Sequence, residues 1–595
     1  LNAGSVINKD SQGTDQGIEG TSVSITAATL TNKFGAIRAD GNATLTSTTK
    51  IDNSQGLVSA GDTLTVQDPG TPGSLSVVNT GGTLVASKKV VLEAGAVTWD
   101  GKLLSLGDMD LAVKQDISFA AGSETVANKN LTLSTTGNIT NSGRLAAGKE
   151  LKLSAKDIEN TATGDIQGET TILKASGTLT NRGVIDGKTT SINAGTLNNR
   201  GTGRIYGDQI SIGAVTLNNE TETVGGVASS GTIAARRRLD LGVTNLNNRD
   251  GALIFSDGDL AIGGALVDGK ASGSAGTVNN HAATIEATRD VDIRTSVLNN
   301  TNGGVTWAMQ GGKASDSITE YALPGSATRY TVDQLAFVSV AAASYDFVRM
   351  MGGLWPSFIG QPDGPIIGPF AGIVVPSAKY PMSRFKTYYA KAPQNSSDLH
   401  GSRPVGTDFQ EDINEPGAWY SRTNPIWATF GVAPPATDTP DDTQRAAYLE
   451  AHQALDAVTE AFIKYVYESR ASAYYSWTYS ESNTTPVLQT SAPGRIVAGR
   501  KMDIAVDSGT NDMSQILAGG ALNVTGGKIT DKNLEVSGSQ NRTGWQYYNN
   551  GSGNMPMPTP YNVSTPITVT LAAARQDGNV AVSGSGTPTG TLAPG

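Results

Sequence analysis

The sequence contains no cysteine among its 595 residues. A disulfide framework, a cysteine-ligated metal and a thiol nucleophile are therefore excluded, and the stability of the fold has to come from packing and hydrogen bonds. The absence of cysteine also suits a protein that crosses an oxidising periplasm unfolded, where stray disulfides would block export.

Charged residues are scarce as well, at 16% of the chain, and the formal net charge is −10. This balance gives no electrostatic reason to expect nucleic acid or anionic lipid as a partner. The one basic cluster, Arg236-Arg237-Arg238, is interpreted as a solvated strand edge. No apolar run approaches the ~20 residues that a membrane-spanning helix needs, so we expect a chain that does not span a membrane.

The residues that catalysis and metal binding require are few and scattered. The three histidines, His281, His400 and His452, never occur in His-x-x-x-His or Glu-x-x-His spacing, and no Gly-x-Ser-x-Gly elbow exists. The nearest phosphate-loop candidate, Gly187-Lys188-Thr189, has Arg182 in the place of the first glycine. The sequence therefore predicts no catalytic residue, no metal, no cofactor and no enzymatic activity.

What the chain does contain is a repeat of about 20 residues. An aliphatic residue followed two places later by asparagine recurs along the first half, and short alternating tails such as Leu151-Lys-Leu153 have the period of two that is typical of strands. The repeat is carried by Leu30-Thr-Asn32, Ile51-Asp-Asn53, Val77-Val-Asn79, Ile139-Thr-Asn141, Ile158-Glu-Asn160, Leu179-Thr-Asn181, Leu197-Asn-Asn199, Leu217-Asn-Asn219, Leu246-Asn-Asn248, Val278-Asn-Asn280 and Leu298-Asn-Asn300.

A unit of this length supplies two or three short strands and cannot bury its apolar face alone. Stacked units would form an all-β parallel β-helix, with the aliphatic residues in one continuous core and the asparagines in side-chain ladders. A β-sandwich or a propeller does not fit, because a propeller blade needs a period nearer 40 to 50 residues and sandwich strands do not repeat one short motif. At about 4.8 Å per coil, residues 1–305 would make a rod of roughly 70 Å.

The repeat is interrupted at 306–482, which holds 26 of the 35 aromatic residues and 14 of the 24 prolines. We expect a separate α+β module here, with one helix after the capping-box spacing of Thr331 and Gln334 and a second beginning at Thr439-Pro440. Aromatic side chains on rigid loops suit a contact surface, and the alternative is that they form the module's own core. The candidate contact residues are Trp355, Phe358, Trp419, Tyr420, Trp427, Tyr474, Tyr475, Trp477 and Tyr479.

The repeat units, for example GRLAAGKELKLSAKDIENTATGDIQGETTILKASGTLTNRGVI, resemble the haemagglutinin repeats of filamentous-haemagglutinin-like exoproteins over about 20–305 and 494–536. The resemblance implies a right-handed β-helix filament, two-partner secretion through an outer-membrane transporter, and a place on the surface of a Gram-negative bacterium. A repeat block followed by a non-repeat module is most similar to the CdiA-type contact-dependent growth inhibition proteins, where that module binds the receptor.

The expected organisation is a β-helix at 1–305, the module at 306–482, resumed coils at 483–540, and a segment at 541–595 that resembles the start of a Tyr/Pro-rich region. Because repeats are already running by Leu30, we expect a fragment of a longer chain, secreted and monomeric. The leading hypothesis is a filament that binds an outer-membrane protein or surface glycan on target bacteria for toxin delivery. The alternatives are an adhesin for host glycans or proteins and a β-helix polysaccharide lyase or glycosidase.

Overall fold

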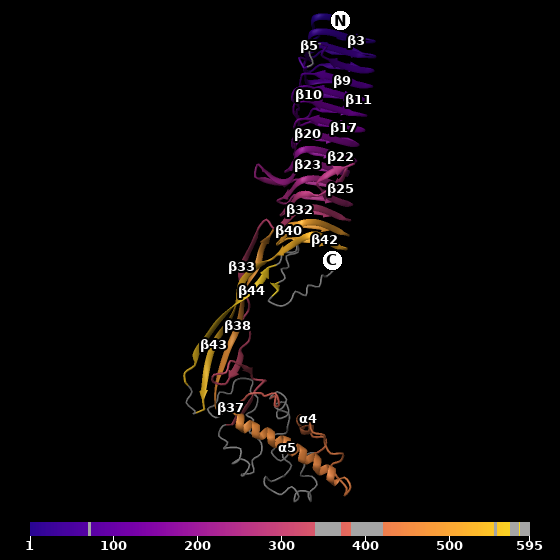
Figure 1. The fold of residues 1–595 in the computed structure, drawn as a ribbon. Coiled ribbons are helices and arrows are strands. Elements are labelled where there is room, and N and C mark those ends of the chain that lie inside the picture. Colours follow the sequence, from indigo (N-terminus) through magenta and orange to yellow (C-terminus); the bar gives the residue numbers. More distant parts are fainter. Residues whose placement is uncertain (70–72, 340–370, 382–420, 552–555, 572–581, 584–595) are drawn as a thin grey trace. The chain divides into compact units, whose positions relative to one another are not determined.

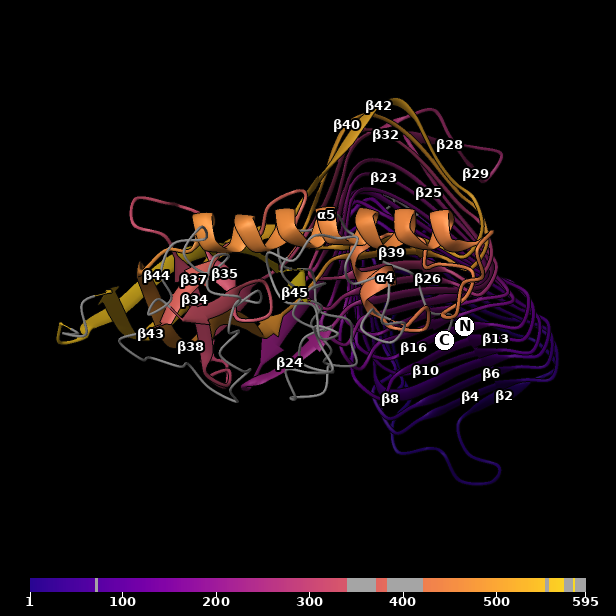
Figure 2. The same ribbon diagram turned by 90° about the horizontal axis from the view of Figure 1, so that it is seen from below.

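A computed structural model describes residues 1–69, 73–339, 371–381, 421–551, 556–571 and 582–583 (Figure 1). The chain divides into two compact units. The solenoid unit comprises Leu1–Ala308, Val487–Val536 and Thr570–Gly595, and the module unit comprises Met309–Pro486 and Ser537–Val569. The solenoid unit is a parallel β-solenoid, as the repeat predicted, and its coils lie over one another in the turned view (Figure 2).

The solenoid strands form one 34-stranded sheet in which each coil pairs in parallel with the next. Its first strands are β1 (Asn2–Ile7), β2 (Ile18–Gly20), β3 (Val23–Thr31), β4 (Ala36–Ala39), β5 (Ala43–Asp52), β6 (Leu57–Ala60), β7 (Thr63–Gln67), β8 (Ser76–Ala86), β9 (Lys89–Ala94), β10 (Ala96–Ser105), β11 (Asp108–Val113), β12 (Ile117–Phe119), β13 (Glu124–Ala127), β14 (Leu131–Thr135), β15 (Ile139–Asn141) and β16 (Arg144–Ala147). The sheet continues with β17 (Glu150–Ala155), β18 (Ile158–Asn160), β19 (Asp165–Gln167), β20 (Thr170–Asn181), β21 (Val184–Asp186), β22 (Thr189–Arg200), β23 (Arg204–Val224), β24 (Val227–Ser230), β25 (Thr232–Arg249), β26 (Leu253–Ser256), β27 (Asp259–Gly263), β30 (Ala275–His281), β31 (Thr284–Ala287), β32 (Val291–Thr301), β39 (Arg495–Ala498), β40 (Met502–Asp512), β41 (Gln515–Ala518) and β42 (Leu522–Lys532).

The predicted asparagine ladder is present and lies inside the stack. Each buried side-chain amide donates from Nδ2 to Oδ1 of the asparagine one coil further on, at 2.7–2.9 Å. Trp99 and Phe119 occupy the ladder position in two coils and divide it into two runs. The runs are Asn8, Asn32, Asn53 and Asn79, and then Asn141, Asn160, Asn181, Asn199, Asn219, Asn248, Asn280, Asn300 and Asn511, which donates to Asp531.

A second ladder lies one residue earlier in the chain, where the side chains are half-buried. Asn218 donates to Asn198, and Asn247 donates to Asn218, both at 2.8 Å, and the ladder continues through Asn279 to Asn299. Here each amide donates to the preceding coil, so the two ladders run in opposite directions. Matched residues on successive coils thus hold the stack in register at two depths.

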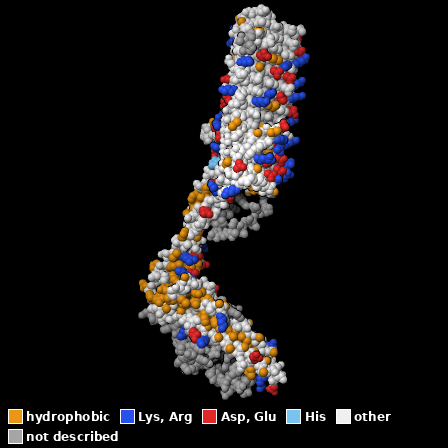
Figure 3. Space-filling model, viewed as in Figure 1, with side chains coloured by type: hydrophobic (Ala, Val, Ile, Leu, Met, Phe, Trp, Pro, Cys, Tyr) orange, Lys and Arg blue, Asp and Glu red, His pale blue; other side chains and the backbone are white. Residues whose placement is uncertain are grey.

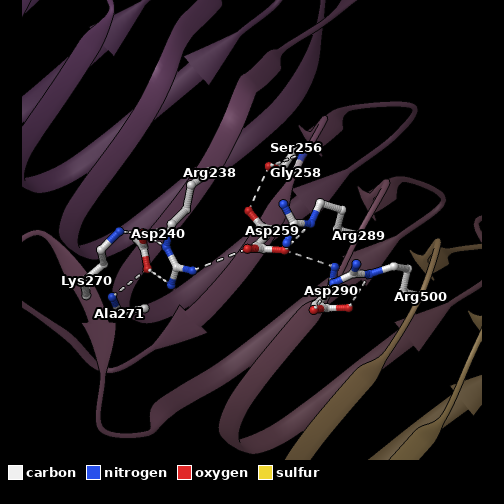
Figure 4. A network of polar contacts seen from close by, with 10 residues as sticks. All are labelled: Arg238, Asp240, Ser256, Gly258, Asp259, Lys270, Ala271, Arg289, Asp290 and Arg500. Carbon is white, nitrogen blue, oxygen red and sulfur yellow. Dashed lines mark hydrogen bonds and ion pairs between the residues drawn. The ribbon is translucent and has the colours of Figure 1, made fainter.

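The larger part of the module unit, Met309–Pro486, is inserted between two neighbouring coils without disturbing their register, and its second part, Ser537–Val569, follows the resumed coils. Strand β39 stacks directly on β31, with Ile496 opposite Ile285, and Asn300 donates to Asn511 across 211 positions of sequence at 2.7 Å. On the outer surface, Arg500 binds Asp290 at 2.9 Å, which extends the ionic network of Asp259 and Arg289 (Figure 4). The solenoid core therefore runs continuously through the point where the module leaves it.

A hairpin, β28 (Ala265–Val267) and β29 (Lys270–Ser272), forms the other end of the network in Figure 4. The buried carboxylate of Asp240 accepts two hydrogen bonds from Arg238 and one from the backbone N–H of Ala271 at 3.0 Å. Lys270 lies 3.6 Å from the same carboxylate. Arg238, from the run Arg236-Arg237-Arg238, therefore helps to hold this hairpin on the solenoid.

The module unit is built on an antiparallel sheet in which β38 (Ala473–Ser491) pairs with β34 (Ile318–Ala322) and β43 (Leu534–Asn550). The same sheet includes β33 (Val305–Gly311), β35 (Tyr330–Thr331), β44 (Thr559–Leu571) and β45 (Val582–Ser583). A smaller pair joins β36 (Ala336–Ser339) to β37 (Ala371–Val374). The helices of the described residues are α4 (Ile426–Phe430) and α5 (Arg445–Ser469).

The two predicted helices have different outcomes. The helix expected after Thr331 is wrong for its described part, because residues 336–339 are strand β36. Phe337 packs against Tyr321 on one side while Ala336 packs with Phe462 on the other, and burial on alternating sides suits a strand. The second helix exists as α5, but it begins at Arg445 rather than Pro440, since Asp441 closes a turn with Thr443 and Gln444 before the helix starts.

Candidate functional site

The nine predicted contact residues are distributed over three environments. Trp355, Phe358, Trp419 and Tyr420 lie outside the described residues. Trp427 lies on α4, where its indole Nε1 donates to the carbonyl of Ser421 at 2.9 Å and its ring is buried against α5. The remaining four, Tyr474, Tyr475, Trp477 and Tyr479, lie together on β38.

The alternation of β38 sends these four side chains to opposite faces of the sheet. Tyr474 is buried on one face, where its ring lies 6.1 Å from that of Tyr321. Tyr475, Trp477 and Tyr479 project from the other face. Trp477 and Tyr479 are 9% and 3% exposed, so they form interior packing rather than a free contact surface.

The second face of β38 carries an aromatic cluster, which we define as Tyr475, Trp477, Tyr479, Tyr548 and Tyr561. The ring of Tyr475 lies 4.7 Å from Tyr548 and 5.8 Å from Trp477, and Tyr479 lies 5.5 Å from Tyr561. Tyr548 and Tyr561 come from β43 and β44, which follow the resumed coils in the sequence. Segments on both sides of those coils therefore complete one surface.

Two arginines border the aromatic cluster. The guanidinium of Arg329 lies 3.9 Å from the centre of the Trp477 ring and donates to the Tyr561 hydroxyl at 3.0 Å and to Glu320 at 3.1 Å. Arg542 lies 5.2 Å from the Tyr479 ring centre and donates to Glu481 at 2.6 Å. Such cation–π and ionic contacts hold the rings in place while leaving charged groups at their edge.

The surroundings of Tyr479 favour its neutral hydroxyl. Burial, reinforced by the neighbouring carboxylate of Glu320, raises the pKa of Tyr479 to about 12. The Tyr479 phenol is therefore protonated at neutral pH, and the arginines that border the cluster are paired with Glu320 and Glu481.

The apolar side chains that the module exposes are ones that the sequence prediction did not select. Trp545 on β43 is 49% exposed, and Met557 and Val563 are also exposed. Hydrophobic side chains gather on the visible face of the module unit, whereas charged side chains are spread along the solenoid unit (Figure 3). The sequence alternation of Trp545, Tyr547 and Asn549 is typical of a strand. It does not identify the neighbouring strand, and only the pairing with β38 places Trp545 in this sheet.

The two histidines of the described ranges, His281 and His452, lie in separate surroundings. His281 exchanges a 2.9 Å hydrogen bond with Thr301, His400 lies outside the described residues, and His452 is buried between the rings of Trp427 and Tyr448. Within the described ranges, no group of three or more histidine, cysteine or carboxylate side chains could hold a metal ion. The helices of the described part include none that is long and apolar enough to cross a membrane.

The buried imidazole makes the stability of the module dependent on pH. Burial lowers the pKa of His452 to about 4, so between its ordinary value of about 6.5 and pH 4 the unfolded chain binds a proton that the folded module excludes. The free energy of unfolding of the module is therefore expected to fall as pH falls through this window, by up to about 3 kcal/mol.

Urea unfolding followed by tryptophan fluorescence at pH 7 and pH 4.5 measures this change. Replacing His452 with Phe should flatten the pH dependence, and His281→Gln in the solenoid unit serves as the control. An equal pH dependence in His452→Phe and the native chain would contradict the assignment.

Comparison with known proteins gives three relatives that share one name. The chain is 28% identical over 362 residues to deoxyribonuclease CdiA of Dickeya dadantii, which covers 52% of this chain and 10% of the relative. It is 33% identical over 217 residues to tRNA nuclease CdiA of Escherichia coli, covering 34% of this chain and 6% of the relative. It is 28% identical over 230 residues to 16S rRNA endonuclease CdiA of Enterobacter cloacae, covering 38% of this chain and 7% of the relative.

The chain thus spans a tenth or less of the length of these relatives, and the nuclease activities in their names are statements about them. No family model matches the chain, and no solved structure matches it at a significant level. Similarity to three CdiA proteins and a parallel β-solenoid with a register kept over many coils agree with each other. Together they fit a CdiA-like protein of the filamentous-haemagglutinin type.

Proposed function

We propose that this chain is part of a secreted cell-surface filament whose module unit binds an outer-membrane receptor on a target bacterium, as a step in contact-dependent toxin delivery. The solenoid unit supplies reach, since each coil adds about 4.8 Å of length. The module supplies recognition through aromatic and apolar side chains that a repeat made of aliphatic residues and asparagine does not offer. Export through an outer-membrane transporter belongs to the same proposal.

The observation that carries the proposal is the insertion of Met309–Pro486, the larger part of the module unit, between two coils that remain in register. An element that the solenoid core does not need for its continuity is free to be specialised for a partner. Aromatic residues with bordering arginines are the side chains most enriched in the energetic centres of protein interfaces. The similarity to CdiA proteins supports a bacterial target.

Deletion of residues 302–491 tests the proposal. Asn302 holds the two ends of the insertion close together, with its Nδ2 2.8 Å from Ser491 Oγ and its Oδ1 accepting from the backbone N–H of Ala492 at 3.1 Å. Joining Thr301 to Ala492 would therefore reconnect two stacked coils. We expect the far-UV circular dichroism to remain that of a β-solenoid and binding to target bacteria, measured by flow cytometry with labelled protein, to be lost.

The hairpin of β23 and β24 provides the matched control, because it is inserted after Asn219 at the same corner of the coil. Removal of residues 222–229 joins Thr221 to Ser230, which already face each other, and should leave binding unchanged. Binding that survives loss of the module, or that disappears with the hairpin, would refute the proposal. Binding to animal cells alone would favour the adhesin.

A further inference from the structure

One corner of the solenoid coil is shortened in three consecutive coils. In the neighbouring coils, six positions separate the inward residue of one strand from that of the next, as from Leu145 to Leu151. The shortened coils have five positions, and the pairing shows the change, since Arg144 pairs with Asp165 but Glu150 pairs with Thr170. The shortened segments run from Ile166 to Thr171, from Ile185 to Thr190 and from Ile205 to Ile210.

The length returns to six positions in the following coil. Gly207 pairs with Ala235, but Gln209 pairs with Arg238, and the register shifts between them. The corner is therefore one position shorter over three coils than on either side. A depression lies along this edge, lined by residues of the first two shortened corners, of the two coils before them and by Arg236, and we call it the notch.

The sequence of the shortened corners is adapted to this geometry. A Cβ on Gly168 or Gly187 would lie 2.9 Å from the carbonyl oxygen of Thr170 or Thr189, closer than such atoms approach. The inward position that follows is a threonine in two of the coils, and the Thr171 hydroxyl donates to the carbonyl of Asp186 at 2.7 Å. Thr190 makes the same bond to the carbonyl of Tyr206. Glycine and threonine thus stabilise the shorter path.

The notch has a volume of about 470 Å³, within the range of sites that hold small ligands. Its small lining residues are Gly168 and Gly187 on the shortened corners and Ala127, Ala146 and Ala147 on the two coils before them, so a ligand can approach the backbone closely. The polar side chains that line it are Arg144, Gln167, Glu169, Asp186, Lys188 and Arg236.

The two arginines are not saturated by their ion pairs. Arg144 is 3.6 Å from Asp165, and Arg236 is 3.8 Å from Asp186 and 3.2 Å from Asp208. Their side chains are 49% and 57% exposed. A guanidinium has five N–H donors in a planar fork that fits a carboxylate or a sulfate. Both therefore retain donors for an anionic ligand.

We propose that the notch is a binding site for an acidic oligosaccharide. Arg144 and Arg236, which come from coils on either side of the shortened ones, bind carboxylate or sulfate groups of the ligand. Gln167 and Asp186 between them bind its hydroxyls, and the small glycine and alanine residues accommodate the sugar rings. An apolar peptide or a lipid chain does not match a lining of this polarity. The site lies in the solenoid unit and is independent of the function proposed for the module.

The test uses the full chain and three acidic probes, trigalacturonate, 3′-sialyllactose and a chondroitin sulfate tetrasaccharide, in isothermal titration calorimetry. We expect at least one to bind and neutral maltotriose not to bind. The double variant Arg144→Gln/Arg236→Gln should weaken that binding about tenfold or more, because a hydrogen bond to a charged group is worth about 1.5–3 kcal/mol. Arg237→Gln is the matched control, since Arg237 is exposed beside Arg236 but does not line the notch.

A second variant tests the shape of the site at constant charge. Insertion of one alanine after Gly168, Gly187 and Gly207 restores six positions to each corner and should abolish binding while the β-sheet circular dichroism is kept. The proposal is overturned if all three acidic probes fail to bind. It is also overturned if the double variant binds as the native chain does, or if Arg237→Gln weakens binding equally, which would indicate general charge attraction.

Discussion

Substitution of Asn219 by Asp is expected to lower the free energy of unfolding of the solenoid by about 3 kcal/mol or more. Asn219 is fully buried, accepts from Asn199 at 2.8 Å, and donates to Asn248 at 2.9 Å and to the carbonyl of Leu253 at 3.0 Å. An aspartate would keep the first bond but would direct a negative oxygen at two acceptors. Urea unfolding followed by circular dichroism measures the change, and hydrogen exchange should locate the opening in neighbouring coils.

The neighbouring residue gives a control of the same chemistry. Asn218 belongs to the outer ladder and is half-buried, so water can replace the bond it donates to Asn198, and Asn218→Asp should cost less than about 1 kcal/mol. The Asn219→Asp variant should also regain stability as pH falls, because a protonated carboxyl can donate again and burial favours the neutral form. If Asn219→Asp and Asn218→Asp lower the free energy of unfolding equally, the inner ladder does not stabilise the solenoid more than the outer ladder does.

The sequence was sufficient to predict the solenoid because its signal is repeated. Leu179 and Asn181 recur one coil later as Leu197 and Asn199, and the structure pairs them residue for residue. A motif that returns every coil defines both the period and the residues that meet, so the core and the inner ladder follow directly. The outer ladder follows the same rule but needs the direction of each amide, which only coordinates provide.

The module was harder to predict because its contacts are not repeated. The capping-box spacing at Thr331 indicated a helix, yet pairing with β37 gave residues 336–339 an extended conformation. Strand β43 pairs with β38 over positions 55 to 77 residues apart in the sequence, from Thr484 with Ser539 to Ala473 with Asn550. The coil strands β39 to β42 lie between them in the chain, and no local pattern predicts such a partner. The burial of Trp477 and the exposure of Trp545 depend on that pairing.

The notch illustrates an intermediate case. Gly187 and Lys188, from the nearest phosphate-loop candidate of the sequence, lie between β21 and β22. Glycine is required at position 187 because the corner is one position short, and a Cβ there would lie 2.9 Å from the carbonyl oxygen of Thr189. That shortening becomes visible in the sequence once the coils are aligned by their inward residues.

Replacement of Trp477 by Ala is expected to destabilise the module unit by about 3–5 kcal/mol while the solenoid unit unfolds as before. The indole is 9% exposed and lies between Tyr475 at 5.8 Å and Arg329 at 3.9 Å, with Tyr561 of β44 at 6.5 Å. Its loss would leave a cavity in the aromatic cluster and remove the ring that stabilises the Arg329 guanidinium. Differential scanning calorimetry should show one transition shifted to lower temperature and the other unchanged.

Trp545 gives the matched control, because it lies in the same sheet on β43 but is 49% exposed. Trp545→Ala should change the stability of the module by less than about 0.5 kcal/mol, as surface substitutions generally do. If this residue contacts the receptor, the same variant should instead weaken binding to target bacteria, so the two tryptophans separate folding from recognition. If Trp477→Ala unfolds the solenoid unit and the module unit in one transition, the two units form one cooperative structure. The solenoid could then not be regarded as stable without the module.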